Sequence, residues 1–406
     1  MPAPPADMKV RAATPPDAEP LLRVLCAAFG LDREAARPLF YQDPYYDLAR
    51  KWVLETPQDG IVACLTIIPA TLVVRGVPLQ TGGIAGVATL PAYQGRGYAS
   101  HLLAQTVRAL ADERVFPISA LFPYSEAFYR RLGWETAARA RRWAGTLLPS
   151  SQDALGGPVR AASLQDPHDR ELLRGLRAAL PTEQTGLCRR DAKRWRVLEM
   201  TTHAWEWHLA ETHGLCEGYV ALERPAGMDD TVIIHEMAAA TDNARRGLVA
   251  FLSREFEGRA GLVWATSAAQ PAAFGLPASG NCRPVEPGMM LRLTDLAAVL
   301  RALHPVLAPS LARAHRTLTI AATDALRPQN NALLRLTSHG VEPGTAHDPD
   351  RLHASIGALA PLITGDCLPS GLAAQGQLWA SLPSALALAD ELFPLTHPFV
   401  APADQF

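Results

Sequence analysis

A chain of 406 residues is too long to fold around one ordinary hydrophobic core, so we expect two or three domains. With 48% hydrophobic and 19% charged residues, the composition is that of a soluble globular protein. The formal net charge of −2 lacks the basic excess that nucleic-acid binding requires, so no nucleic-acid partner is expected.

Several other classes of protein are disfavoured by simple sequence signals. The six cysteines are scattered without a C-x-x-C pair, which argues against a zinc site or a disulfide framework and for reduced thiols. His235-Glu236 is not part of an H-E-x-x-H motif, because Ala239 takes the place of the second histidine. The N-terminus lacks a signal-peptide pattern, and no run of 18 apolar residues suggests a membrane span. We therefore expect a cytoplasmic protein without a metal site.

The first predicted elements alternate between strand and helix patterns. Residues 10–13 resemble a strand, and residues 16–30 an amphipathic helix that ends at a glycine. Residues 31–52 are rich in Arg, Asp and Tyr, and they fit either a surface helix pair or a substrate lid. Residues 61–68 and 70–75 are predicted to be two strands joined at Pro69.

The stretch from residue 81 to residue 103 carries the most specific local pattern. Small and β-branched residues at 84–90 predict a strand, Pro91 ends it, and a glycine-rich segment leads into leucines at helical spacing. A tight loop between a strand and a helix N-terminus can hold phosphate groups, because unpaired amides point at the ligand there. Gly97 would let the backbone approach the phosphates closely, and Arg96 could add positive charge.

A second motif lies about thirty residues further on, where Tyr129-Arg-Arg-Leu-Gly133-Trp134 follows a short helical segment. Together with Gln94-x-x-Gly97-x-Ala99, this motif resembles the GNAT family of acyl-CoA-dependent N-acyltransferases. In that family the loop binds the pyrophosphate of the cofactor, the preceding strand binds the pantetheine arm, and the tyrosine lies by the thioester sulfur. The resemblance thus implies acetyl-CoA as cosubstrate and a cofactor site that comprises Val87, Ala88, Thr89, Gln94, Gly95, Arg96, Gly97, Tyr98, Ala99 and Ser125.

The middle of the chain looks like a degraded copy of the first part. Residues 148–158 have the composition of a linker, and helix and strand patterns follow. Residues 240–252 can be aligned with residues 90–102, so that Gly247 falls on Gly97. Ala244 replaces Gln94 in this alignment, and no tyrosine-glycine motif follows. We therefore expect a second acyltransferase-like domain with a structural role.

The last hundred residues predict strands at 317–322 and 333–336 and amphipathic helices around an apolar interior, which resembles the sterol-carrier-protein fold. The expected fold class is mixed α/β and α+β. The expected domains are a catalytic GNAT domain at 1–147, a degenerate GNAT-like domain at 148–300, and a sterol-carrier-like domain with a C-terminal tail at 301–406.

This order of domains, ending in a phenylalanine, resembles the enhanced intracellular survival (Eis) family of N-acetyltransferases over essentially the whole chain. The resemblance implies that Tyr129 protonates the leaving thiolate and that the C-terminal carboxylate of Phe406 is the base. It also implies a homo-oligomer, specifically a hexamer. His101 is an alternative base, but it lies in the helix after the loop and is better explained as a packed or surface histidine.

The leading hypothesis is therefore an N-acetyltransferase that uses acetyl-CoA to acetylate an amine of a small polycationic molecule or of a lysine side chain. A first alternative is a lipid-binding protein in which the acyltransferase fold is a relic without activity. A second alternative keeps the enzyme but changes the acyl-CoA, or replaces the amine with another acceptor.

Overall fold

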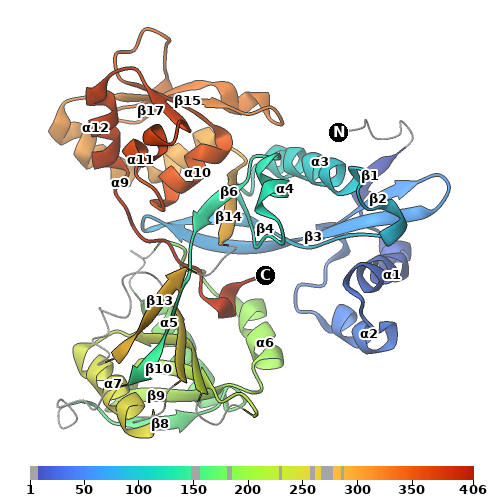
Figure 1. The fold of residues 1–406 in the computed structure, drawn as a ribbon, viewed down its shortest axis with the longest axis vertical. Helices are drawn as coiled ribbons and strands as arrows, with labels where there is room; N and C mark the ends of the chain where they lie inside the picture. Colours follow the sequence, from blue (N-terminus) through green and yellow to red (C-terminus); the bar gives the residue numbers. More distant parts are fainter. Residues whose placement is uncertain are drawn as a thin grey trace. The chain divides into compact units, whose positions relative to one another are not determined.

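The computed structural model describes residues 8–147, 156–180, 185–227, 231–256, 261–266, 278–284 and 288–406. Most of the linker predicted at 148–158 lies outside the described residues. The chain divides into two compact units, which are considered one at a time below (Figure 1). The first unit comprises the chain up to Ala137, Met289–Thr396 and Phe406, and the second comprises Ala138–Gly288 and His397–Gln405.

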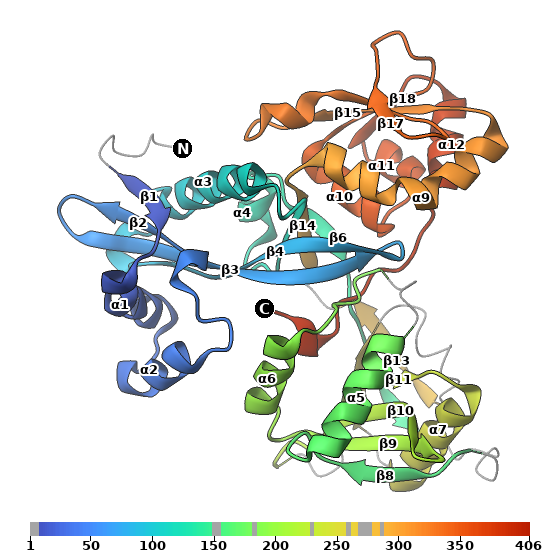
Figure 2. The same ribbon diagram turned by 180° about the vertical axis from the view of Figure 1, so that it is seen from behind.

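The first unit contains a seven-stranded sheet with the order β1-β2-β3-β4-β5-β14-β6. Its strands are β1 (Lys9–Ala12), β2 (Lys51–Thr56), β3 (Gly60–Val74), β4 (Val77–Thr89), β5 (Ile118–Leu121), β14 (Met289–Leu293) and β6 (Glu135–Ala138). Its helical segments are η1 (Pro15–Asp17), α1 (Ala18–Phe29), α2 (Arg33–Gln42), η2 (Leu48–Arg50), η3 (Pro91–Tyr93), α3 (Tyr98–Glu113) and α4 (Glu126–Arg130). Helices α1 and α3 cover opposite faces of the sheet (Figures 1 and 2).

Strand β3 contradicts the prediction that a proline interrupts it. Pro69 was expected to separate two strands, but β3 runs through it without interruption and pairs Pro69 with Gly82 of β4. The pairing of β2 with β3 ends at Thr66, so one edge of β3 carries no β2 partner at Pro69. A proline is tolerated at such an edge, because the hydrogen bond that it cannot donate is not needed there.

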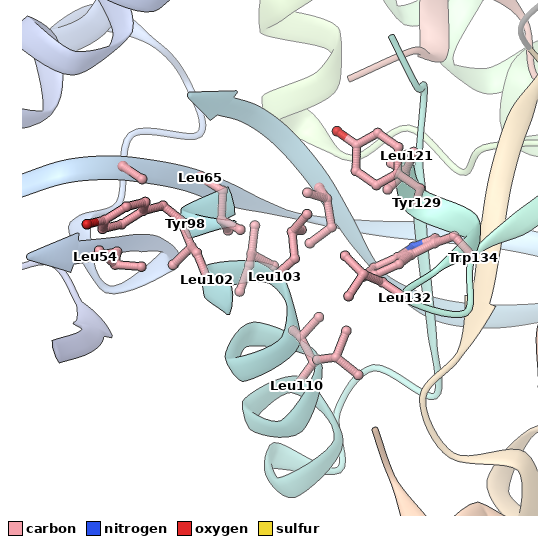
Figure 3. Close-up of a cluster of buried hydrophobic side chains, with 14 of the residues drawn as sticks. Leu54, Leu65, Tyr98, Leu102, Leu103, Leu110, Leu121, Tyr129, Leu132 and Trp134 are labelled. Atoms are coloured by element: carbon pink, nitrogen blue, oxygen red, sulfur yellow. The ribbon is translucent and has the colours of Figure 1, made fainter. Parts of the chain in front are cut away.

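The core of the first sheet forms between alternate residues of its strands and the apolar face of a helix. Leu65 and Ile67 of β3 pack against Leu102 and Leu103 of α3, and all four are buried. Figure 3 shows this cluster, with Tyr98 at one end of it and Tyr129 beside Trp134 at the other. The helix that follows the glycine-rich loop is therefore anchored by its apolar face, which fixes the position of its N-terminus.

The second unit contains a seven-stranded sheet with the order β13-β7-β12-β11-β10-β9-β8. Val220 and Leu222 of β10 face α7, whereas Tyr219 and Ala221 face α5 and α6, as strand alternation requires. Its elements are β7 (Arg141–Leu147), β8 (Val159–Ala162), α5 (Pro167–Ala179), α6 (Ala192–Thr201), β9 (Glu206–Thr212), β10 (Leu215–Glu223), β11 (Thr231–Ala239), α7 (Asp242–Phe256), β12 (Gly261–Thr266), β13 (Ala278–Pro284) and, in the tail, η5 (Pro402–Asp404).

The two sheets correspond strand by strand, but each takes one strand from the other part of the sequence. In the first sheet β14 lies between β5 and β6, and in the second β7 takes the equivalent place between β12 and β13. Residues 289–293, which were predicted to belong to the second domain, therefore complete the first sheet through pairing with β5. Local sequence patterns could not predict this exchange, because the pattern of a strand does not determine which other strand it pairs with.

A third sheet of the first unit has the order β17-β16-β15-β18-β19, with helices packed on it. Helix α10 is buried along its whole length, whereas the sequence predicted amphipathic helices in this part of the chain. The elements are α9 (Leu296–Ala314), β15 (Leu318–Thr323), η4 (Pro328–Asn331), β16 (Leu333–Leu336), β17 (Val341–Pro343), β18 (Arg351–Ser355), α10 (Ile356–Thr364), α11 (Pro369–Ala374), β19 (Leu378–Ala380) and α12 (Pro383–Leu392). None of the described helices is both long and apolar enough to span a membrane.

Candidate active site

The centre of the first sheet opens where two parallel strands part. Strand β4 pairs with β5 only from Thr81 to Gly83, opposite Ile118 to Ala120. Beyond Gly83, β4 continues for the rest of its length beside β3 alone. Along that part of β4, alternate backbone amides and carbonyls on the side away from β3 are free to bind an extended ligand.

A β-bulge changes the direction of this free edge. Cys64 of β3 pairs with Ala88, and Thr66 pairs with Ala85, so β4 accommodates one extra residue between the two pairs. Gly86 lies in this bulge with a φ of 58°, a conformation in which a side chain would be strained. The bulge includes Val87 and immediately precedes Ala88 and Thr89, and these three residues are predicted to contact the pantetheine arm.

The loop after β4 presents an open helix N-terminus. Gly97 is the N-cap of α3 with a φ of 84°, and it has no side chain that could cap the helix. The amides of Tyr98, Ala99 and Ser100 have no hydrogen-bond partner within the described part of the chain. Such amides, together with the positive end of the helix dipole, suit a phosphate group.

The loop itself is held in place by its own contacts. The side-chain amide of Gln94 donates a hydrogen bond to the carbonyl of Thr89 at 3.1 Å, which ties the loop to the end of β4. The rings of Tyr93 and Tyr98 pack edge to face with centroids 5.3 Å apart. Gly95 has a φ of 73°, and a methyl group there would meet nothing within 4 Å, so conformation rather than space favours glycine.

A cavity of about 590 Å³ lies against this strand, loop and helix start. Most of the predicted cofactor residues line it: Val87, Ala88, Thr89, Gln94, Gly95, Gly97, Tyr98 and Ala99. Arg96 and Ser125 are not part of this lining. The guanidinium of Arg96 lies 5.8 Å from the centre of the Tyr93 ring, and Ser125 begins α4 without a capping hydrogen bond.

The cavity also brings in residues that the motifs did not single out. Arg131, at the C-terminal end of α4, contributes a positive charge to the lining, and Ala28 and Phe29 of α1 contribute apolar surface. Tyr124 and Phe128 complete the wall next to Arg131. Arg131 lies within the Tyr129–Gly133 motif, so its position in that motif was a signal that sequence reasoning could have used.

Tyr129 lies in the core beside the cavity rather than in its lining. It is 3% exposed, and its ring packs edge to face against Phe128 and Tyr124, with centroids 4.9 and 5.9 Å away. Burial, with a smaller contribution from Tyr124, raises the pKa of Tyr129 above its ordinary value of 10. The phenol is therefore neutral at physiological pH and carries a proton.

The turn that carries Tyr129 is fixed from the other part of the same unit. The guanidinium of Arg292, on β14, donates a hydrogen bond of 2.8 Å to the carbonyl of Leu132 and pairs with Asp324 at 2.7 Å. Gly133 has a φ of 85°, and a methyl group there would overlap Arg292. The glycine of the motif is thus required both by its backbone conformation and by this close contact.

The C-terminal residue packs where β4 and β5 part. The Phe406 ring lies edge to face with Phe122, with centroids 5.6 Å apart. A methyl group built on Gly83 would lie only 2.5 Å from Cε2 of Phe406, so the ring rests directly on the β4 backbone. Gly83 and Ala120 form the last β4–β5 pair, which places the terminal residue at the opening of the sheet.

The corresponding part of the second unit has a shorter connection from strand to helix. Strand β11 also carries a bulge, at His235, and also extends beyond its parallel partner β12. However, only Ala240 and Thr241 separate β11 from α7, and Gly247 lies inside the helix. The expectation that Gly247 occupies a loop equivalent to Gly97 was therefore wrong. Gly247 instead permits close packing, because a methyl group there would overlap the backbone of Gly157.

Among the described residues, no group of three or more His, Cys, Asp or Glu side chains could hold a metal ion. The His235 ring stacks on Trp205 with centroids 3.9 Å apart, and its Nε2 lies 2.8 Å from a carboxylate oxygen of Glu223. Burial lowers the pKa of His235 despite that carboxylate.

Comparisons with known protein families match three segments. Residues 9–137 and residues 186–293 each match an acetyltransferase (GNAT) domain, and residues 298–401 match a sterol carrier protein domain. No curated protein matches the chain.

Similar solved structures span the full length of the chain. A GCN5-related N-acetyltransferase from Anabaena variabilis is 21% identical, with 98% of this chain and 100% of that chain covered and a TM-score of 0.77. One from Kribbella flavida is 22% identical, with 98% of both chains covered, and also has a TM-score of 0.77. Eis1 from Mycobacterium abscessus is 19% identical, with 98% of this chain and 100% of that chain covered, at the same TM-score. At these identities the similarity establishes the fold.

Proposed function

Because the chain is an acyltransferase with two GNAT domains and a sterol carrier protein domain in an Eis-like order, we propose that it is an acetyl-CoA-dependent N-acetyltransferase. The acceptor that we propose is an amine of a small polycationic molecule or of a lysine side chain. The first sheet carries the reaction, the protein acts in the cytoplasm, and it assembles as a hexamer.

One observation supports this proposal above the others. The uncapped N-terminus of α3 and the free edge of β4 line one cavity of about 590 Å³. The helix amides suit a pyrophosphate, and the strand edge suits a pantetheine arm that pairs with it like an added strand. Arg131 would supply a positive charge to the phosphates in addition to Arg96.

Acetyl transfer needs an acid for the departing thiolate. The amine nitrogen attacks the thioester carbon, the resulting oxyanion is stabilised by backbone amides of β4, and the carbon–sulfur bond then breaks. Tyr129 would donate its phenolic proton to the sulfur as that bond breaks. Because burial raises the pKa of Tyr129, the acid stays protonated across the pH range in which amines are acetylated.

The amine must lose a proton in the same reaction, and the C-terminal carboxylate of Phe406 is the base that we propose. The aromatic ring on Gly83 and Phe122 anchors this residue at the opening between β4 and β5. An isolated carboxylate is a weak base, so it would act by attracting the cationic amine and passing its proton on through water.

The test is a set of tail variants assayed for thiol release from acetyl-CoA. Deletion of Phe406, or addition of residues after it, should lower kcat by roughly 10²–10⁴-fold, because each removes the carboxylate from its position. Phe406→Ala should have a smaller effect, since the carboxylate remains and only its anchor is lost. A fully active extended enzyme would rule out the terminal carboxylate as base.

The acceptor and the assembly need separate measurements. A panel of polyamines, aminocyclitol-type amines and lysine peptides, each with acetyl-CoA and other acyl-CoAs, would identify the acceptor and the acyl preference. Release of thiol without any amine in the panel being acetylated would contradict the proposed acceptor class. Light scattering after gel filtration would test the hexamer.

A further inference from the structure

The tail before Phe406 is built into the second unit. The amide of Phe399 donates to the carbonyl of Thr185 at 3.0 Å, and the carbonyl of Pro398 accepts from the amide of Arg139 at 3.2 Å. Gly186 has a φ of 95°, and a methyl group there would overlap the backbone of Phe399. The tail therefore runs along a surface that is shaped for it.

The strongest contacts converge on Asp404, whose side chain is fully buried. Its Oδ1 accepts a hydrogen bond from Nε of Arg190 at 2.6 Å, and its Oδ2 accepts one from Arg177 at 2.9 Å. Burial by itself would raise the pKa of Asp404, but Arg190 and Arg177 outweigh that effect and the pKa is lowered. The carboxylate is therefore charged and doubly bound.

A third arginine holds the backbone on both sides of Asp404. Arg194 of α6 donates to the carbonyls of Ala403 and Gln405, the latter at 2.6 Å. Glu236 of β11 pairs with Arg190 at 2.7 Å and with Arg177 at 3.6 Å, which balances the excess positive charge. A buried cluster so closely paired fixes one geometry, because breaking any pair would leave an uncompensated charge.

This cluster lies at the part of the second repeat that corresponds to the free strand edge of the first repeat. Glu236 lies on the part of β11 that extends beyond the last β11–β12 pair, Ile234 with Trp264, and η5 of the tail packs against β11. The equivalent part of β4 in the first repeat is the free strand edge of the cavity. The second repeat thus binds the tail at its sheet opening.

We propose that Asp404 and the arginines 177, 190 and 194 form a clamp that holds the last residues of the chain and thereby positions the terminal carboxylate of Phe406. Only Gln405 lies between Asp404 and the terminal residue, so a fixed Asp404 confines the Cα of Phe406 to within roughly 7 Å of the Cα of Asp404. The proposal rests on the proposed role of Phe406 as base. It makes Asp404 a positioning residue rather than a catalytic one.

The first experiment compares Asp404→Asn with Asp348→Asn. Asp348 is also buried and accepts hydrogen bonds from Thr319 and Thr345. Because it lies beside the third sheet and outside the tail, it controls for the loss of a structural aspartate. Asp404→Asn should lower kcat by roughly 10- to 100-fold, because small misplacements of a reacting group have costs of this size. Its affinity for acetyl-CoA should be unchanged, and Asp348→Asn should retain the wild-type kcat.

A second readout follows the tail without any assay of activity. A carboxypeptidase that prefers aromatic ends should release Phe406 slowly from the wild type and from Asp348→Asn, and at least about tenfold faster from Asp404→Asn, because an exopeptidase needs a freed chain end. Mass spectrometry of the intact protein reports the loss. Equal release rates and an unchanged kcat for Asp404→Asn would overturn the clamp.

Arg194→Gln covers the case in which Asp404→Asn fails to fold. It removes the hydrogen bonds to the tail carbonyls but leaves Arg190 and Arg177 on Asp404, so a smaller rise in Phe406 release and a smaller loss of kcat are expected. In an enzyme without Phe406, Arg194→Gln should cause no further loss of the residual rate. An equal loss in both backgrounds would mean that Arg194 acts on the fold alone, and the clamp would be wrong.

The two proposals fail separately in these experiments. If the enzyme without Phe406 is fully active, the role of Phe406 as base is wrong. If that enzyme is inactive but both clamp variants keep the wild-type kcat and release rate, the base stands and the clamp is overturned.

Discussion

The two acetyltransferase-like repeats share their sheet order and the bulge in the central strand, yet they differ in the connection from strand to helix. In the first repeat, residues 90–97 lead from β4 to α3, and Gly97 leaves the helix uncapped. In the second, Thr241 accepts a hydrogen bond from the amide of Ala244 at 3.1 Å, and Asp242 occupies the first turn of α7.

The difference shows that the residues that specify the core are not the residues that form the site. Apolar residues at strand and helix spacing specify the sheet in both repeats, whereas the cavity of the first depends on one loop and on a few unpaired amides. An N-cap side chain and a carboxylate at a helix N-terminus satisfy the same groups that a phosphate would bind. In the second repeat the amide of Ala244 already has such a partner, and the carboxylate of Asp242 would repel a phosphate.

The largest effect is expected from Gly97→Val. A β-branched residue would be strained at a φ of 84° and would stand between the ligand and the amides of α3, so binding of acetyl-CoA should fall below detection. Isothermal titration calorimetry measures it. An unchanged dissociation constant would show that the uncapped helix is not the phosphate site, and the comparison with α7 would lose its meaning.

Tyr129→Phe should separate chemistry from binding within the first repeat. Loss of the acid should lower kcat by roughly 10²–10⁴-fold, while the affinity for acetyl-CoA changes little. Because burial raises the pKa of Tyr129, the wild-type kcat should show no decline caused by this tyrosine at pH values up to about 10. Steady-state kinetics from pH 7 to pH 10 would test both points, and a phenylalanine variant with full turnover would indicate another acid.

Gly247→Ala tests the claim that this glycine has a packing role, unlike Gly97. The added methyl group would overlap the backbone of Gly157, so the free energy of unfolding should fall by roughly 1–3 kcal/mol, the usual cost of overpacking. Thermal unfolding measures the loss, and acetyl-CoA affinity measured beside it should stay at the wild-type value. A drop in affinity with unchanged stability would reverse the roles of the two glycines.

The smallest effect is expected from Thr241→Gly, which removes the N-cap of α7. Binding should stay at one equivalent of acetyl-CoA per chain, as in the wild type, because the connection to α7 remains short and Asp242 still places a carboxylate at the helix N-terminus. Calorimetric stoichiometry decides this. Two equivalents bound by the wild type would show that the second repeat retains a cofactor site.

Local sequence patterns determined much of this protein. The glycine-rich segment at 94–99 and the Tyr129–Gly133 motif predicted the first acetyltransferase fold, because turn glycines and helix periodicity act over a few residues. The fold class, with tandem GNAT-type domains and a sterol carrier protein domain, was confirmed. Eight of the residues that line the cavity, between Val87 and Ala99, were also predicted from the family that the two motifs resemble.

Tertiary structure alone decided what depends on distant parts of the chain. The exchange of β7 and β14 between the sheets and the contact of Arg292 with Leu132 follow from pairing that no local pattern encodes. Gly247 was misread for the same reason, since a glycine that suits a loop also suits a tight helix contact. The burial of Asp404 among three arginines belongs here too, because a charged residue near a chain end looks exposed until its partners are known.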